Sequence, residues 1–264
     1  TANVTQSLTK GTNYNLNGFV TGEGTDIELS AVTGKYADKN AAADKAVTFD
    51  GLTLTGTGAG NYTLNKTALT GTGTITKRAL TLGAVAAQTK TYDGTTAADA
   101  GKFSAGLNNT VAGDSVTATA AGATYNSKDV AGANTVNYTG VALGGADAGN
   151  YSLAAVAAQG TGTITRRALT FDAVAAQTKI YDGNTNADAA QFSATLGNIV
   201  AGEENSVSAT AAGATYNDKN VAGANKVSYT GVALRGTGAA NYSIADTAQG
   251  KGTITKRALT LGTV

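Results

Sequence analysis

The chain has 264 residues, of which 42% are hydrophobic and 14% are charged, and its formal net charge is +1. It contains no histidine and no cysteine, so the usual metal ligands, the thiol nucleophile and the commonest general base are missing, and we expect no enzyme, no cofactor and no metal site. The near-zero net charge gives no basic surface for nucleic acid, and no run of about 18 apolar residues exists that could span a bilayer.

The most informative feature of the sequence is an internal repeat. Arg78, Arg167 and Arg257 occupy matching positions at spacings of 89 and 90 residues. A period of about 90 residues is too long for one coil of a solenoid and has the size of a small independent domain. The pattern predicts a first repeat that is divergent or incomplete at its N-terminus, a second and a third full repeat, and the start of a further one: residues 1–77, 78–166, 167–256 and 257–264.

In chain order, the first recurring element is an alternating apolar segment that changes phase at a glycine. Before Gly140, Val136 and Tyr138 share one phase, and after it Val141 and Leu143 fall in the opposite phase. A β-bulge at the glycine would return both halves to one face of the sheet. The alternative is a turn that joins two short strands. The same step occurs at the matching glycines of the other repeats, Gly51 and Gly231.

The next element is the junction between repeats. Ile75 and Leu80 lie in opposite phases, so we expect one strand to end and the next to begin with almost no residues between them. The same pattern follows Ile164 and Ile254. Such a junction lacks the slack of a Gly/Ser linker and restricts how neighbouring domains tilt. Three such domains in line would form an elongated rod of roughly 100 Å.

A basic pair marks each junction, as Lys77-Arg78, Arg166-Arg167 and Lys256-Arg257. One interpretation is a solvated border whose charges discourage pairing between strand edges. Anion binding by the paired side chains is the other interpretation.

Each full repeat continues with a Tyr-Asp-Gly turn, which begins at Tyr92 and at Tyr181. We expect the tyrosine ring to close the core of its domain while its hydroxyl reaches water. Stacking of the ring on a sugar is the alternative.

The segment after the turn, residues 184–196, has apolar Ala189, Phe192 and Leu196 at spacings of three and four, which fits a short helix. Its counterpart in the second repeat has Gly101 in the middle, which disfavours a helix. The presence of one short helix per repeat therefore stays open.

The same region carries oxygen-bearing side chains at alternate positions, as a calcium loop does: Asp182, Asn184, Asn186 and Asp188. An EF-hand needs glycine at the sixth position and glutamate at the twelfth, where this chain has Ala187 and Ser193. We therefore favour a turn and a helix cap over calcium.

Further segments with a period of two lie at residues 115–125, 150–157 and 161–165, and clusters of Asn, Asp, Lys and Gly separate them. We expect a mainly β chain, a tandem array of small β-rich domains that are each β-sandwich or β-grasp-like.

Two covalent modifications are considered and not favoured. Lys128 with Asn150 is a candidate pair for an isopeptide crosslink, but the sequence gives no sign that they meet. The N-Y-[ST] triplets are formal glycosylation sequons, and we interpret them as packing positions of predicted strands: Asn61, Asn150 and Asn241.

Several motifs recur in one order: K-R-A-L-T, T-K-x-Y-D-G, G-N-Y-[ST]-[LI] and G-T-I-T. From about residue 20 onward the chain resembles the YDG-type repeats, related to mucin-binding-type β-grasp repeats, of large bacterial surface adhesins. Many of these carry a filamentous-haemagglutinin-like secretion domain. The resemblance implies an exported protein at the cell surface of a Gram-negative bacterium, with the repeats as its stalk. Residues 1–20 lack a YDG turn and depart from the pattern.

These observations favour a structural function. We expect a monomeric stalk or spacer segment, without membrane insertion, that projects the binding region of an adhesin away from the cell. The alternative is a repeated module that binds glycans or mucin. Host or environmental glycans or proteins are the partners implied for the parent adhesin. Because the chain has no methionine, even at position 1, we expect it to be a mature or excised part of a longer chain.

Overall fold

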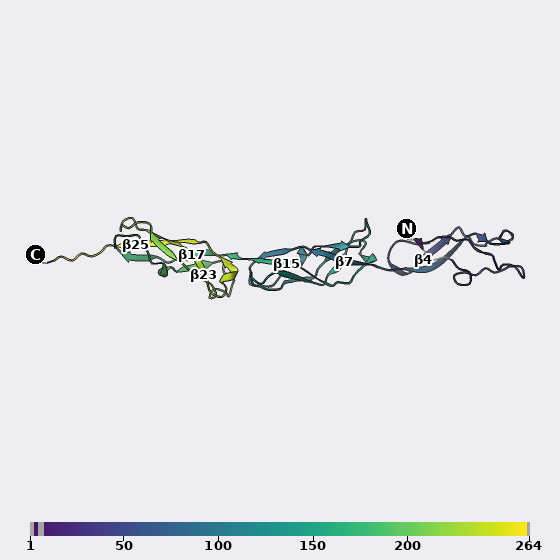
Figure 1. Cartoon of the computed structure of the whole chain (residues 1–264), viewed down its shortest axis with the longest axis horizontal. Coiled ribbons are helices and arrows are strands. Elements are labelled where there is room, and N and C mark those ends of the chain that lie inside the picture. The colour runs from purple at the N-terminus through teal and green to yellow at the C-terminus, as the bar shows by residue number, and fades with distance from the viewer. Residues whose placement is uncertain (1–2, 5–7, 263–264) are drawn as a thin grey trace. The chain divides into compact units, whose positions relative to one another are not determined.

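The computed structural model describes residues 3–4 and 8–262, and they form a mainly β chain, as the sequence predicts (Figure 1). The chain divides into two compact units. Unit 1 comprises Thr1–Gly83, Gly106–Thr119 and Ala142–Val156. Unit 2 comprises Ala84–Ala105, Ala120–Val141 and Ala157–Val264. The borders drawn between repeats from the sequence stay a prediction.

The largest sheet of unit 1 is antiparallel, with the order β1-β3-β4-β6. Its strands are β1 (Asn3–Val4), β3 (Gly34–Tyr36), β4 (Ala42–Asp50) and β6 (Ala68–Ile75). A second sheet has the order β14-β7-β9, formed by β14 (Tyr151–Leu153), β7 (Arg78–Val85) and β9 (Ala105–Asn108). Two small sheets pair β2 (Glu28–Leu29) with β5 (Leu54–Thr55), and β10 (Thr117–Thr119) with β13 (Ala142–Gly144).

Unit 2 contains two four-stranded sheets of the same design, with the orders β11-β12-β15-β8 and β21-β22-β25-β18. In each, the last two strands named are parallel and the other pairs are antiparallel. The first consists of β8 (Gln88–Thr91), β11 (Gly122–Tyr125), β12 (Thr135–Thr139) and β15 (Ala157–Thr165). The second consists of β18 (Gln177–Ile180), β21 (Gly213–Tyr216), β22 (Lys226–Thr230) and β25 (Thr247–Thr255).

Three short pairs complete unit 2. β16 (Arg167–Ala168) runs parallel to β24 (Tyr242–Ser243). Two antiparallel pairs join β17 (Thr170–Val174) with β19 (Ala194–Gly197), and β20 (Ser208–Thr210) with β23 (Ala233–Arg235). β17 and β23 are labelled beside β25 in Figure 1.

The direct passage from strand to strand is confirmed at two of the three junctions; after Thr255, where β25 ends, residues 256–262 form no strand. β6 ends at Ile75 and β7 begins at Arg78, while β15 ends at Thr165 and β16 begins at Arg167. In both cases the two strands belong to different sheets. The change of phase in the sequence therefore marks the point where the chain leaves one sheet and enters the next.

The β-bulge expected at Gly51, Gly140 and Gly231 is wrong, and the glycine instead turns the chain between two sheets. β22 pairs with β21 and β25, whereas β23, on the other side of Gly231, pairs only with β20. Gly231 has a φ of 63°, and a Cβ placed on it would lie 2.8 Å from the Cβ of Ala212. The positive φ and this close contact both require glycine here.

The short helix considered for residues 184–196 is limited to one 3-10 turn, η4 (Ala189–Gln191). Asp188 caps this turn, because its side chain accepts a hydrogen bond of 2.9 Å from the N–H of Ala190. β19 begins at Ala194 and pairs with β17, so the sheet ends the helical segment. The other 3-10 turns are η1 (Ala59–Asn61), η2 (Ala100–Lys102), η3 (Ala148–Asn150) and η5 (Ala239–Asn241). Within residues 3–4 and 8–262, no helix has the length and hydropathy needed to cross a membrane.

Each unit contains a hydrophobic cluster that draws on a single repeat. In unit 1 the buried members come from the first repeat: Tyr14, Leu29, Val47, Phe49 and Leu52. In unit 2 they come from the third repeat: Phe192, Tyr216, Ala224, Val227, Tyr229, Val232, Ala248 and Ile254. The rings of Phe192 and Tyr229 pack edge-on, with their centroids 4.8 Å apart.

Candidate functional site at the borders between repeats

The tyrosine of the YDG turn lies at the border between the second and third repeats, inside unit 2. The N–H of Tyr92 donates to the carbonyl of Thr165 over 2.9 Å, just beyond the last paired residues of β8 and β15. The Tyr92 side chain is 0% exposed, and its ring packs edge-on against Tyr242 of the third repeat at 5.3 Å between centroids. The expectation that its hydroxyl reaches water is wrong, and no ring face is open to a sugar.

The carboxylate of Glu203 is the common acceptor at this border. Its Oε1 accepts from the Tyr92 hydroxyl and its Oε2 from the Tyr242 hydroxyl, both over 2.7 Å. The Tyr242 hydroxyl also accepts from the N–H of Val200 over 3.1 Å. Lys128 of the second repeat lies with its Nζ 3.9 Å from Oε1. One carboxylate therefore joins two repeats through charge-assisted hydrogen bonds.

Both tyrosine hydroxyls at this border are held in the protonated form. Burial, followed by the hydrogen bond to Glu203, raises the pKa of Tyr242 to about 12. The same two causes raise the pKa of Tyr92 above its ordinary value. Both groups therefore donate at neutral pH. Loss of either proton would place a phenolate against the Glu203 carboxylate.

Asn241 makes a second connection across the same border. Its Oδ1 accepts from the N–H of Val130 and its Nδ2 donates to Asp129, both over 2.9 Å. Asn241 is 5% exposed and is the last residue of η5, so its sequon does not begin inside a strand as expected. The buried amide satisfies a backbone group of the preceding repeat, which explains asparagine at this position.

The border between the first and second repeats lies inside unit 1 and uses matching positions. Asp114 accepts from Tyr151 over 2.6 Å and from Lys39 over 2.8 Å. Asn150 accepts from the N–H of Ala41 over 2.8 Å. The hydrogen bonds from Lys39 and then Tyr151 lower the pKa of Asp114. At both borders the following repeat therefore supplies an acid, a tyrosine and an asparagine. The side chain of the preceding repeat that donates to the acid is Lys39 at this border and Tyr92 at the border in unit 2.

The other two residues of the YDG motif shape the turn. Gly94 has a φ of +77°, and a Cβ placed on it would lie 3.0 Å from Cγ1 of Val200, in the third repeat. Asp93 accepts from the Lys90 ammonium over 2.7 Å and from the N–H of Thr95 over 3.0 Å. Glycine therefore permits both the turn and the close approach, and aspartate fixes the loop that follows.

The loop considered for calcium binds a lysine ammonium instead. Lys179 Nζ donates to Asp182 Oδ1 and the Asn184 carbonyl, each over 2.8 Å, and to the Asn186 carbonyl over 2.9 Å. Lys90 makes the matching set of bonds in the second repeat. The hydrogen bond from Lys179 lowers the pKa of Asp182. Of the side chains that suggested a cation site, Asp182 and Asn184 therefore accept from a cation of the chain itself, and Asp188 caps η4 instead.

The arginines of the first two basic pairs, Arg78 and Arg167, each hold a loop residue and are not merely solvated. Arg167 donates to the backbone oxygen of Asn198 over 2.7 Å, and Nδ2 of Asn198 donates to the Ala168 carbonyl over 2.7 Å. Asn198 has a φ of 67°, a conformation that asparagine tolerates. Arg78 and Asn109 repeat the arrangement in unit 1. Both proposed interpretations of the pair, solvation and anion binding, miss this role for the arginine.

The candidate isopeptide pair has separate partners. Lys128 lies 3.4 Å from Asp129 and 3.9 Å from Glu203. Asn150 binds Ala41 and Asn40 of the first repeat.

Tyr181 of the second YDG turn is half-buried and packs against the core of the third repeat.

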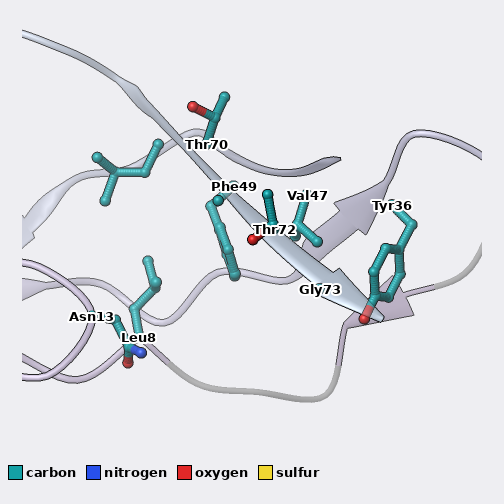
Figure 2. Close-up of a pocket in the computed structure, with 10 residues that line it drawn as sticks. Leu8, Asn13, Tyr36, Val47, Phe49, Thr70, Thr72 and Gly73 are labelled. Carbon is teal, nitrogen blue, oxygen red and sulfur yellow. The ribbon is translucent and has the colours of Figure 1, made fainter. Parts of the chain in front are cut away.

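A cavity of about 200 Å³ lies in unit 1 beside β4 and β6 (Figure 2). Figure 2 shows the Phe49 ring pointing toward the side on which Leu8 and Asn13 lie. Tyr36 closes the other end near Gly73, and its hydroxyl donates to the carbonyl of Thr74. Among the described residues that line it, apolar and hydroxyl side chains dominate and none is a carboxylate, lysine or arginine. This chemistry suits packing better than proton transfer.

Sequence reasoning missed the acidic residues at the borders. A pattern was present, since a valine precedes an acid by three residues with glycine between them in every repeat: Val20 to Glu23, Val111 to Asp114 and Val200 to Glu203. In each repeat the N–H of that valine binds the hydroxyl of the N-Y-[ST] tyrosine. Tyr62 also donates to Glu23, so the acid–tyrosine pair recurs throughout the chain.

The model of the YDG domain family matches residues 2–70, 76–159 and 165–249. The chain therefore belongs to the YDG domain family and carries the domain in tandem. Comparison with curated proteins and with solved structures finds no match to this chain.

Proposed function

We propose that this chain is a stalk or spacer segment of an exported bacterial surface adhesin and that it performs no catalysis. Its role is to hold successive repeats at a set distance. The observation that carries the proposal is the border inside unit 2, where a strand of one repeat passes into a strand of the next across Arg166 alone. Tyr92, Glu203 and Asn241 fasten the two repeats on either side of that passage.

A border of this kind resists bending for two reasons. The single connecting residue gives little backbone length over which to tilt one repeat against the other. Tilting also exposes the buried ring of Tyr92 and breaks hydrogen bonds to Glu203 and Asn241, whose groups would lose partners. A stiff border serves a spacer, whereas a set of independent binding modules has no need of it.

Small-angle scattering of the full chain tests the spacer function. Three domains in line should give a maximum dimension of roughly 100 Å. A matched variant with Gly-Ser-Gly-Ser inserted after Arg166 and Tyr92→Ala should show a broader distribution of distances, because both restraints at the border are removed. A compact particle for the unaltered chain would contradict the proposal.

We place the segment at the cell surface of a Gram-negative bacterium. The placement rests on the repeats, which resemble those of surface adhesins. Antibody against residues 78–256 should label intact cells that express the parent protein, and external protease should remove the label. Label that appears only after lysis would argue against this location.

On a glycan array the segment should show no retention, since the YDG ring of Tyr92 is buried.

A further inference from the structure

The first and the last strand-forming segments of the third repeat run side by side in the same direction. We call residues 167–180 the entry segment and residues 242–255 the exit segment. They meet in two parallel pairs, β16 with β24 and β18 with β25. In both pairs each residue lies opposite the residue 75 positions later, as Arg167 lies opposite Tyr242. The two segments therefore keep one register from end to end.

Further hydrogen bonds extend both parallel pairs. The N–H of Leu169 donates to the carbonyl of Ser243 over 2.8 Å, and the N–H of Tyr181 donates to the carbonyl of Thr255 over 2.9 Å. The hydroxyl of Thr255 also donates to the carbonyl of Lys179 over 3.3 Å. The exit segment is therefore bonded to the entry segment near both of its ends.

Buried side chains anchor both segments in the interior of the repeat. Leu169 and Ile254 are 6% and 1% exposed, and Ile254 belongs to the hydrophobic cluster of the third repeat. The buried Gln177 donates from Nε2 to the carbonyl of Asp188 over 2.8 Å and accepts from its N–H over 3.0 Å. Sliding of one segment along the other would therefore expose apolar side chains and leave buried polar groups without partners, besides breaking the backbone bonds.

The direction of the two segments decides how the repeat responds to tension. The chain enters the strands of the third repeat at Arg167 and leaves them after Thr255. Because the segments are parallel, tension pulls the entry segment toward its N-terminal end and the exit segment toward its C-terminal end. The two segments must then slide past each other, so the evenly spaced bonds of the parallel ladder bear the load together. Two strands pulled apart from the same end would instead separate one bond at a time.

The second repeat contains the same parallel pair within unit 2. The four residues of β8 pair with the last four residues of β15, as those of β18 pair with the last four of β25. The N–H of Tyr92 donates to the carbonyl of Thr165 over 2.9 Å, as the N–H of Tyr181 donates to the carbonyl of Thr255. The arrangement is therefore a feature of the repeat and not of one copy.

We propose that the entry and exit segments form a mechanical clamp, which lets the repeat carry tension along the chain without unfolding. The inference rests on the proposed spacer function, because a spacer between a cell and the surface that its adhesin holds is pulled from both ends. It adds a load-bearing role to the setting of distance. Resistance to a pull is governed by the rate of unfolding, and this rate depends on the bonds that must break together.

Single-molecule stretching of the full chain tests the clamp. The chain contains no cysteine, so introduced cysteines define the two points that are pulled. Ala168→Cys with Lys256→Cys applies the force at opposite ends of the clamp, and the matched control, Ile180→Cys with Lys256→Cys, applies it at one end. All three positions are exposed, and the clamp is the same in both variants. We expect a rupture force several-fold higher in the first variant, and equal forces would overturn the proposal.

A second measurement does not depend on the introduced cysteines. The unaltered chain, stretched through tags at its two termini, should show a rupture that releases about 300 Å, the extended length of roughly 89 residues. This rupture should occur at the high force of the variant that carries Ala168→Cys, and rupture at the low force of the control would contradict the clamp.

Scattering separates the clamp from the spacer function on which it rests. An extended particle together with equal rupture forces in the two variants would exclude the clamp and leave the spacer function intact. A compact particle together with unequal forces would support the clamp and contradict the spacer function.

Discussion

The two borders between repeats use matching residues of the following repeat but differ in what the preceding repeat provides. In unit 1, Lys39 reaches Asp114 with a side chain that is 58% exposed. In unit 2, the buried ring of Tyr92 takes that place beside Glu203, and Lys128, the counterpart of Lys39, stands 3.9 Å away. The asparagine connections, to Ala41 and to Val130, are the same.

This difference shows what the tyrosine of the YDG motif does. Residues 1–77 contain no YDG turn, and their border with the second repeat is an ion pair between Lys39, which is 58% exposed, and Asp114, whose side chain is 10% exposed. The second repeat has the turn, and its border is buried. Tyr92 therefore packs against the repeat that follows it, and through this residue the YDG motif of the second repeat joins two neighbouring domains.

The largest expected effect comes from Tyr92→Ala, which removes the buried ring from the border in unit 2. We expect a loss of about 3–5 kcal/mol in the free energy of unfolding, as for other buried aromatic side chains. Tyr181→Ala is the matched control, since it changes the same motif at a half-buried position, and it should cost clearly less. Denaturant unfolding measures both, and equal losses would mean that the border adds nothing.

Asn241→Ala tests the connection that the two borders share. The change leaves the N–H of Val130 without its partner, and we expect a loss of about 1–3 kcal/mol. Asn61→Ala alters the exposed counterpart in the first repeat and should stay within about 0.5 kcal/mol. Faster hydrogen exchange at Val130 in the first variant alone would locate the effect; unchanged exchange would argue against the connection.

Alkaline pH should weaken the buried border. The pKa of Tyr242 is raised from 10.0 to about 12, so the stability it contributes is present below pH 10 and is lost as pH rises toward 12. Glu203→Gln removes the adjacent negative charge and should let the tyrosines titrate at lower pH. The absorbance of tyrosinate between pH 8 and 12 measures the titration of these tyrosines. Identical titration curves for the variant and the unaltered chain would contradict the role of Glu203.

The smallest effect should come from Lys39→Met at the border in unit 1, where the lysine side chain is 58% exposed. The pKa of Asp114 is lowered from 3.8, so its contribution is present above that pH and is lost as pH falls through the lowered value. High salt should reduce the difference in stability between Lys39→Met and the unaltered chain, because the exposed ammonium of Lys39 is open to screening by ions. Melting temperatures at low and high salt test this against Lys35→Met, an exposed lysine of the same repeat. If Lys39→Met lowered stability more than Tyr92→Ala, the border in unit 1 would be the stronger of the two, contrary to our expectation.

Local patterns predicted some of these features and missed others. The change of phase between Ile75 and Leu80 correctly predicted the direct junction, since a period of two reports which face of a strand is buried. The same signal at Gly231 was misread as a bulge, because a switch between sheets produces the same shift. The alternating oxygen-bearing side chains that begin at Asp182 were identified from the sequence, but the cation that Asp182 and Asn184 bind, the Lys179 ammonium, was not.

The sequence by itself determined the mainly β character, the repeat, and the places where strands meet, because these depend on alternation and on residues close along the chain. Only the tertiary structure decided that Tyr92 enters the next repeat to meet Glu203, 111 residues away. Pairings across such separations depend on the packing of whole domains, which no local pattern specifies.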